Sequence, residues 1–187
     1  MDQRDLVRRA QGGDQDAFAE LAGAAVARLD AAARLILRDS ELARDAVQDS
    51  MVRAWRDLPG LRDPDRFTPW LHRLTVNACL DVARRRRRRS IEVELTPIDM
   101  PFVGDETAEF AERERIDDAL RELEPEFRAV VVLHYFLGMP LHDVAVAMRI
   151  PLGTVKSRLH RALRSMRIAL EESEVDPAMA VPGGQLA

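Results

Sequence analysis

The chain has 187 residues, a formal net charge of −4 and a single cysteine, Cys79. One cysteine excludes an intramolecular disulfide framework and suits a reducing compartment, where we expect Cys79 to be an ordinary buried residue. No apolar run approaches the length of a membrane span and the N-terminus lacks the apolar core of a signal peptide, so we expect a cytoplasmic protein with no membrane insertion.

The first half of the chain predicts helices only. Ala, Leu, Arg and Val dominate and no sustained strand alternation occurs, so the fold class is expected to be all-α. The first two helices are expected over residues 2–11 and 15–38. A third should begin at an N-cap formed by residue 39 or 40 and end at Asp57, before a Pro-Gly pair.

A fourth helix is predicted after the loop LRDPDRF. Thr68 is expected to be its N-cap, with Pro69 at the first helical position, where a missing N–H costs nothing. The helix should continue through six consecutive arginines to about Arg88. Taken alone, the arginine run fits either a generic nucleic-acid patch or a sequence that merely looks like a nuclear-localisation signal.

The chain is expected to divide into two small helical domains, residues 1–89 and 109–172. Residues 90–108 predict a flexible acidic linker, because they contain two prolines, a glycine and no sustained period. Roughly 19 linker residues can span at most about 65 Å when extended. Residues 173–187 predict a flexible tail.

Charge is segregated along the chain. Residues 1–89 carry 18 basic and 14 acidic side chains, residues 90–126 carry 3 and 13, and residues 127–170 carry 7 and 1. An acidic block therefore separates two basic blocks. The overall acidity hides basic surfaces that suit a polyanionic partner.

The second domain predicts a helix-turn-helix. A helix over residues 125–137 should stop at Gly138. After it come the segment LHDVAVAM, a short break at RIPLG and a helix from Thr154 to about Glu172. In a helix-turn-helix the second helix enters the major groove of DNA.

This second helix has one apolar face and one basic face. No acid occurs between residues 154 and 170, whereas solvated helices usually mix both signs to gain i,i+4 pairs, so DNA binding is favoured over simple solvation. Its first turn should be nearest the bases, and its later arginines should meet phosphates. The apolar face expected to dock the helix comprises Val155, Leu159, Ala162, Leu163, Met166 and Leu170. The expected DNA contacts are Thr154, Val155, Lys156, Ser157, Arg158, Arg161 and Arg164.

The string IPLGTVKSRLHRALRSM resembles region four of the group IV, or extracytoplasmic-function (ECF), sigma factors of bacterial RNA polymerase. ELEPEFRAVVVLHYFLGMPLHDVA resembles the helices that precede it in that family. The resemblance implies that this domain reads the −35 promoter element and packs on the flap of the polymerase β subunit. One departure is Arg149, because the family usually has glycine in this turn. If the position needs a positive φ, arginine costs something like 1 kcal/mol there.

Two segments of the first domain extend the resemblance. SELARDAVQDSMVRAWRDL is similar to the region two helix that binds the β′ clamp of core polymerase, and RFTPWLHRLTVNACLDVARRRRRR is similar to the segment that recognises and opens the −10 element. The implied polymerase contacts are Asp45, Gln48, Asp49, Val52 and Arg56. The implied −10 and melting residues are Trp70, Arg73, Asn77, Arg84, Arg85 and Arg86. From the residues alone, the first set could be a solvated face and Trp70 could be a core residue.

Two other classes of protein fit less well. The four histidines are scattered, and the metal-ligand, phosphate-loop and nucleophile-elbow motifs are lacking, so we expect no enzyme and no cofactor. A stand-alone helix-turn-helix regulator would leave the first domain unexplained and would tend to dimerise, yet no heptad seam is evident. We interpret the chain as an ECF sigma factor that binds core RNA polymerase and promoter DNA. The resemblance also implies control by an anti-sigma factor.

Overall fold

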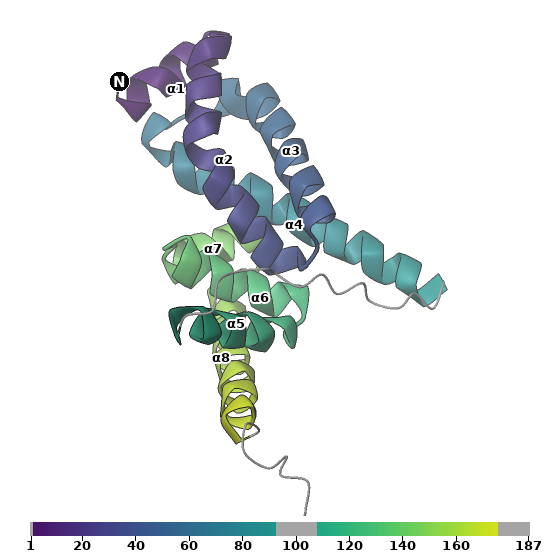
Figure 1. Ribbon diagram of the computed structural model, residues 1–187. Coiled ribbons are helices and arrows are strands. Elements are labelled where there is room, and N and C mark those ends of the chain that lie inside the picture. The colour runs from purple at the N-terminus through teal and green to yellow at the C-terminus, as the bar shows by residue number, and fades with distance from the viewer. Residues whose placement is uncertain (1, 93–107, 176–187) are drawn as a thin grey trace, which may run out of the picture.

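The computed structural model of the protein describes residues 2–92 and 108–175. These residues form α-helices and helical turns and contain no strand, which confirms the predicted all-α fold (Figure 1). The N-terminal half holds α1 (Gln3–Gln11), α2 (Gln15–Leu37), α3 (Ser40–Asp57) and α4 (Phe67–Glu92). The C-terminal half holds α5 (Ala108–Arg121), α6 (Pro125–Val131), α7 (Leu141–Met148) and α8 (Leu152–Val175).

The predicted start of α4 at Thr68 is wrong. A 3-10 turn over Pro64–Arg66 precedes the helix, and the Asp63 carboxylate accepts a hydrogen bond from the backbone N–H of Asp65. The helix then begins at Phe67, which is buried, while the Thr68 hydroxyl donates to the side-chain oxygen of Gln3 at 3.2 Å. The boundary therefore lies before Thr68. Asp63 caps the 3-10 turn that leads into α4, and Phe67 anchors the first turn of the helix in the core.

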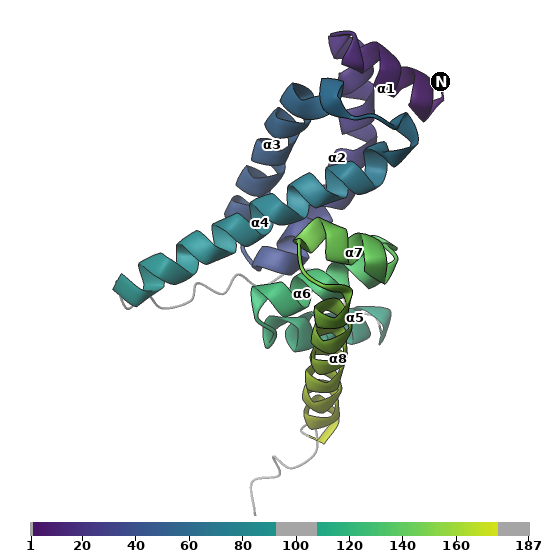
Figure 2. The ribbon, with the colours of Figure 1, turned by 180° about the vertical axis from the view of Figure 1, so that it is seen from behind.

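The end of α4 also differs from the prediction. The helix runs past the arginines to Glu92, so the segment predicted as linker begins as helix. Figure 2 shows this end of α4 projecting beyond the other helices. The remainder of the predicted linker, residues 93–107, and residues 176–187 of the predicted tail lie outside the described residues.

The helix predicted over residues 125–137 is divided in two. After α6 the chain widens into a π-helical turn, Val132–Phe136, in which the N–H of Leu137 donates to the carbonyl of Val132 at 2.9 Å. In this segment Leu137 is buried and Tyr135 is 61% exposed. Gly138 ends the segment with a φ of 72°, as its position after the apolar run predicted.

The helix-turn-helix is formed by α7 and α8, and its turn has the positive φ that the sequence left open. Arg149 has a φ of 56°, and the next N–H, that of Ile150, donates to the carbonyl of Ala145 at 3.1 Å. This closes α7 in a left-handed cap that normally favours glycine. The helix α8 begins at Leu152, two residues before the predicted Thr154. Leu163 is exposed, so it does not dock α8 as predicted.

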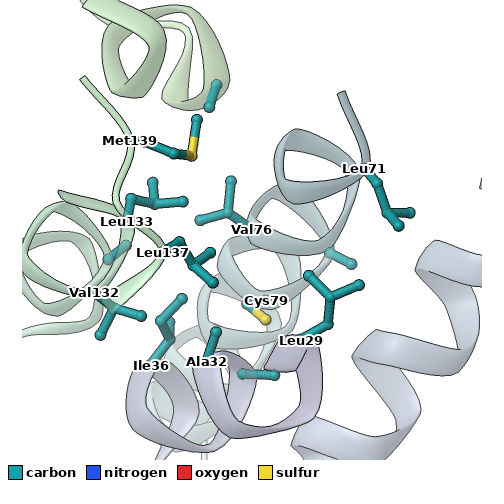
Figure 3. Packing of buried hydrophobic residues seen from close by; sticks show 14 of the residues in the cluster. Leu29, Ala32, Ile36, Leu71, Val76, Cys79, Val132, Leu133, Leu137 and Met139 are labelled. Atoms are coloured by element: carbon teal, nitrogen blue, oxygen red, sulfur yellow. The ribbon is translucent and has the colours of Figure 1, made fainter. Parts of the chain in front are cut away.

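The two halves share one apolar core. Helix α7 packs against α4, and both α6 and the π-helical turn pack against α2. In Figure 3, Leu137 lies among Ile36 of α2 and Val76 and Cys79 of α4. We call this contact between α2/α4 and α6–α7 the seam. Cys79 is fully buried beside it, and burial raises the pKa of its thiol to about 12, which confirms an unreactive core cysteine.

A buried histidine lies on the same face of α4 as Val76, one helical turn earlier. His72 is only 8% exposed, and its Nδ1 has no hydrogen-bond partner among the described residues. Burial lowers the pKa of His72 to about 4, and the nearby Arg28 lowers it further by repulsion. The imidazole is therefore neutral in the folded chain at pH 7.

Replacing Arg149 with glycine should stabilise the chain. Glycine adopts the left-handed conformation without the steric cost that a Cβ brings, so Arg149→Gly should raise the free energy of unfolding by about 1 kcal/mol, measured by urea denaturation. Arg38 is a matched control, since its φ is 57° but its side chain pairs with Asp117. Arg38→Gly should show no such gain. An unchanged or lower stability for Arg149→Gly would show that the turn carries no strain.

The stability of the chain should fall between pH 6.5 and pH 4 because of His72. In the unfolded chain this histidine takes up a proton near pH 6.5, whereas in the folded chain it stays neutral until about pH 4, so its contribution is complete above pH 6.5 and is lost as the pH falls. The loss should reach about 3 kcal/mol relative to His72→Gln. The exposed His160 gives the control variant His160→Gln, which should keep the parent's pH profile. Parallel profiles for His72→Gln and the parent would contradict the prediction.

Candidate nucleic-acid interface

The outer face of α8 is basic. Lys156, Arg161, Arg164 and Arg167 are exposed, and none of them forms an ion pair with another described residue. No acidic side chain occurs between residues 154 and 170 to neutralise them. The face therefore presents a row of cations to solvent, and a phosphate backbone is a polyanion of matching charge.

Two of the predicted contacts on α8 are not fully exposed. Val155 is fully buried, so it docks the helix and does not belong to the exposed face. Arg158 is half-buried, with its guanidinium 6.0 Å from the centre of the Phe127 ring of α6. Arg158 thus packs on α6, and only part of its side chain faces outward. Ser157 is exposed and donates to the carbonyl of Thr154 at 3.0 Å.

A second basic surface lies at the projecting end of α4. The side chains of residues 84–88 are all exposed. Arg84 pairs with Asp81 at 3.0 Å, and Arg86 pairs with Asp39 at 3.4 Å. Arg85 forms no ion pair with another described residue. The concentration of cations on a helix end that extends from the body gives a surface suited to a phosphate backbone.

The predicted −10 residues earlier on α4 are half-buried. Trp70 packs against the core, with its ring centre 5.9 Å from that of Phe67. The amide of Asn77 donates to the carbonyl of Arg73 at 2.7 Å. Trp70, Arg73 and Asn77 are each partly exposed. Trp70 therefore packs against the core with one part of its ring and leaves another part accessible.

The predicted polymerase-facing residues of α3 lie on one outer face. Val52 is 64% exposed, and Asp45, Gln48 and Arg56 are exposed beside it. Asp49 is half-buried because it pairs with Arg53 at 2.6 Å. An apolar centre with a charged rim is the usual composition of a protein interface.

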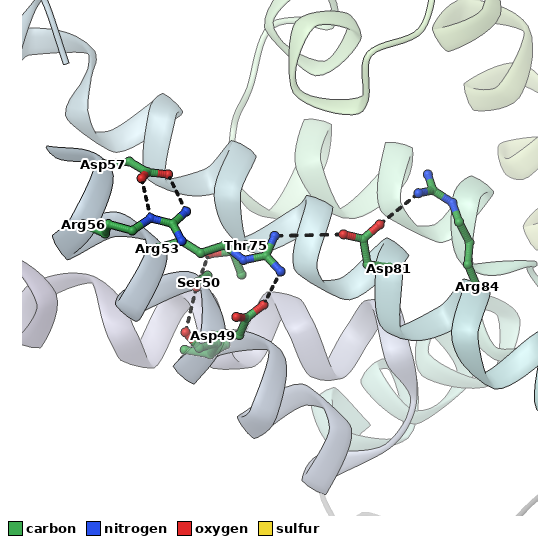
Figure 4. A network of polar contacts seen from close by, with 9 residues as sticks. Asp49, Ser50, Arg53, Arg56, Asp57, Thr75, Asp81 and Arg84 are labelled. Carbon is green, nitrogen blue, oxygen red and sulfur yellow. Dashed lines mark hydrogen bonds and ion pairs between the residues drawn. The ribbon is translucent and has the colours of Figure 1, made fainter. Parts of the chain in front are cut away.

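Sequence reasoning missed the link between α3 and α4. Arg53 lies between Asp49, at 2.6 Å, and Asp81 of α4, at 4.0 Å, and Asp81 in turn pairs with Arg84 (Figure 4). Beneath this chain the hydroxyl of Thr75 donates to that of Ser50 at 3.0 Å. The i,i+4 spacing of Asp49 and Arg53 was a usable signal, but the contact across helices was not visible in the sequence.

Within the described ranges, no three His, Cys, Asp or Glu side chains gather as metal ligands would. In the same residues, no helix is long and apolar enough to cross a membrane. The candidate sites among the described residues are therefore surfaces: the basic faces of α8 and α4 and the mixed polar and apolar face of α3.

Two family models match the chain. Sigma-70 region 2 matches residues 15–89, and Sigma-70, region 4 matches residues 113–166. Among curated proteins, the ECF RNA polymerase sigma factor SigM of Mycobacterium tuberculosis is 38% identical over 151 residues, which cover 80% of this chain and 75% of SigM. The RNA polymerase sigma-E factor of Streptomyces avermitilis is 33% identical over 144 residues, 77% of this chain and 79% of that protein.

Two solved structures share the fold. One is CnrH in complex with the cytosolic domain of CnrY, with a TM-score of 0.66 and 28% identity over 91% of this chain and 97% of CnrH. The other is the sigma factor RpoE of Bartonella quintana in complex with the anti-sigma factor NepR, with a TM-score of 0.71 over 82% of this chain and 96% of RpoE. At 22% identity the second supports the fold alone. With both regions matched in order and relatives covered over most of their length, the chain belongs to the ECF family of RNA polymerase sigma factors, which are transcription initiation factors.

Proposed function

We propose that this chain directs core RNA polymerase to promoters by reading a −35 element with α8 and a −10 element with α4. The observation that carries the proposal is the acid-free face of α8, whose exposed cations have no partner among the described residues. In a helix-turn-helix, the start of the second helix reaches base edges while later positions meet phosphates. We assign Lys156 and Ser157 to the first role, and Arg161 and Arg164 to the second.

The −10 element is assigned to α4. Trp70, Arg73 and Asn77 supply an aromatic ring, a cation and an amide along one half-buried strip, a combination suited to unstacked bases. The arginines that follow, Arg84, Arg85 and Arg86, would track the phosphate backbone. Strand opening is favoured if these residues hold single-stranded bases more tightly than paired ones.

Core polymerase is assigned to the outer face of α3, centred on Val52. Binding to core polymerase through this face would supply most of the energy that holds the chain at a promoter. If α8 and α4 meet only a few phosphates, each contributing about −0.9 to the salt slope, the free chain binds DNA weakly at physiological salt. The two similar structures were solved with an anti-sigma factor or the cytosolic domain of CnrY bound, which supports a protein inhibitor as a further partner of this chain.

Co-purification with core RNA polymerase, followed by run-off transcription from a promoter library, tests the proposal. We expect a stable complex with core and new start sites that share a −35 and a −10 sequence. Tight, sequence-specific binding by the free chain without any binding to core would instead indicate a stand-alone regulator and would overturn the assignment of α3.

Changing Val52 to glutamate should weaken binding to core polymerase. The substitution places a charge at the apolar centre of the outer face of α3, where a buried charge without a partner is costly, so the affinity should fall by at least about tenfold. A titration of labelled chain with core measures it. Ala24 of α2 is exposed and uninvolved, so Ala24→Glu should bind core as the parent does. Equal affinities for the two variants would remove the face of α3 from the interface.

Changing Arg164 to alanine should lower the salt dependence of promoter binding by the holoenzyme. Loss of one phosphate contact should reduce the magnitude of the slope of log K against log salt by about 0.9, with little change in sequence preference. Arg34→Ala, on α2, is the control and should leave the slope unchanged. If Arg164→Ala keeps the parent's slope and affinity, the face of α8 does not contact phosphate at this position.

A further inference from the structure

The segment that joins α3 to α4 is anchored at both ends and exposed between them. Leu58, in the 3-10 turn Leu58–Gly60 that follows α3, is fully buried, and Phe67 at the start of α4 is 3% exposed. Most of the residues from 59 to 66 are exposed. We call residues 58–66 the α3–α4 loop. Two anchors leave the middle of such a loop free to open locally unless a neighbouring element holds it.

Helix α1 is that neighbouring element. It packs against both 3-10 turns of the α3–α4 loop, and Figure 2 shows it at the end of the bundle where the chain crosses from α3 to α4. Leu6, Val7 and Ala10 are buried, so the apolar face of α1 fixes the helix on the core. The helix precedes residues 15–89, the range that the Sigma-70 region 2 model matches.

Gln11, the last residue of α1, makes the most direct contact with the loop. Its half-buried amide donates to the carbonyl of Leu58 at 3.1 Å and to the carbonyl of Leu61 at 2.7 Å. An amide NH2 group has two donors, so one glutamine can satisfy both carbonyls. The Leu58 carbonyl also accepts from the N–H of Leu61 at 3.0 Å, which closes the turn. Gln11 therefore ties the two ends of this turn to α1.

The start of α1 holds the other end of the loop. The guanidinium of Arg4 donates two hydrogen bonds to the carboxylate of Asp65, and the Thr68 hydroxyl donates to Gln3 at 3.2 Å. The hydrogen bond from Arg4 holds the pKa of the Asp65 carboxyl below its usual value, so the pair is charged at pH 7. Its side chains are 46% and 55% exposed, and such pairs contribute little alone, so Gln11 carries most of the contact.

The loop leads directly into the residues assigned to the −10 element. Phe67 packs against Trp70, with 5.9 Å between the ring centres. The position of Phe67 therefore sets where the exposed part of the Trp70 ring lies. An aromatic ring that stacks on an unpaired base must be held in place, because a small displacement of a binding group weakens its contact.

We propose that Gln11, assisted by Arg4, is a positioning residue for −10 recognition, which fixes the α3–α4 loop and, through Phe67, the place of Trp70. This inference rests on the proposed function, which assigns Trp70 to the −10 element. The brace formed by Gln11 and Arg4 is itself a property of the free chain. Holding the loop in advance lowers the entropy that must be lost when an unpaired base binds.

Hydrogen exchange measured by mass spectrometry tests the brace in the free, full-length chain. Gln11→Leu keeps a similar volume and removes both donors, so the amides of the α3–α4 loop should exchange about tenfold faster while those of α2 keep the parent's rates. Gln11→Glu presents a carboxylate of the same shape to two carbonyls and should have at least the same effect. Gln15 is exposed at the start of α2, so Gln15→Leu is the matched control and should leave loop exchange unchanged.

Binding by the holoenzyme tests the positioning role. With Gln11→Leu, affinity for a single-stranded oligonucleotide that carries the −10 sequence should fall about fivefold, while affinity for a duplex carrying only the −35 element stays the same. Binding of the chain to core should also stay the same, whereas a general loss of structure would lower all three affinities.

The ion pair provides a second, surface-exposed set of variants. Arg4→Asp should weaken binding of the −10 oligonucleotide selectively, and Arg4→Asp with Asp65→Arg should regain part of the loss, because the pair is restored with its charges exchanged. Arg34 pairs with Asp30 at 2.6 Å within α2 and gives the control Arg34→Asp, which should bind the oligonucleotide as the parent does.

Each outcome decides one part of the proposal. Loop exchange at the parent's rate in both Gln11 variants would show that there is no brace. Faster exchange with full affinity for the −10 oligonucleotide, or with an equal loss of all three affinities, would overturn the positioning role. If the parent holoenzyme binds neither promoter element, the proposed function fails and the positioning role fails with it, while the exchange rates still decide the brace.

Discussion

The burial of Leu137 between α2 and α4 is the contact on which the arrangement of the whole chain depends. Leu133 and Leu137 both face inward, as their i,i+4 spacing allows, while Tyr135 faces outward. The π-helical turn Val132–Phe136 packs against α2 together with α6, so this stretch of chain contacts the N-terminal half directly.

Most of the positive charge lies on the outer surfaces, away from this buried apolar contact. The cations of α8 and of the end of α4 lie on exposed surfaces. Where the two halves meet, Arg38 forms an ion pair with Asp117, which also lies near the buried Arg128. One carboxylate thus serves two arginines in this part of the described structure.

The interface residues show how function and stability share side chains. Trp70 packs on Phe67 and is still partly exposed, and Arg158 lies over the ring of Phe127 while its helix faces outward. The chain of ion pairs from Asp49 through Arg53 to Asp81 ties the polymerase-facing helix to the arginine-bearing one. Such sharing places the proposed contacts on rigid elements, because their rotamers are held by packing as well as by a partner.

The sequence by itself determined the all-α class, the helix-turn-helix, the basic face of α8 and the family, since these follow from local periodicity, turn residues and charge counts over short windows. It also marked Arg149 as a turn residue that would be strained if its φ were positive, and the structure gives it a φ of 56°. The tertiary structure alone decided that Leu163 is exposed, that α4 starts at Phe67 and that the Nε of Arg128 is buried without a hydrogen-bond partner among the described residues. These depend on contacts between residues far apart in the chain, and periodicity along one helix cannot say which neighbour covers each face.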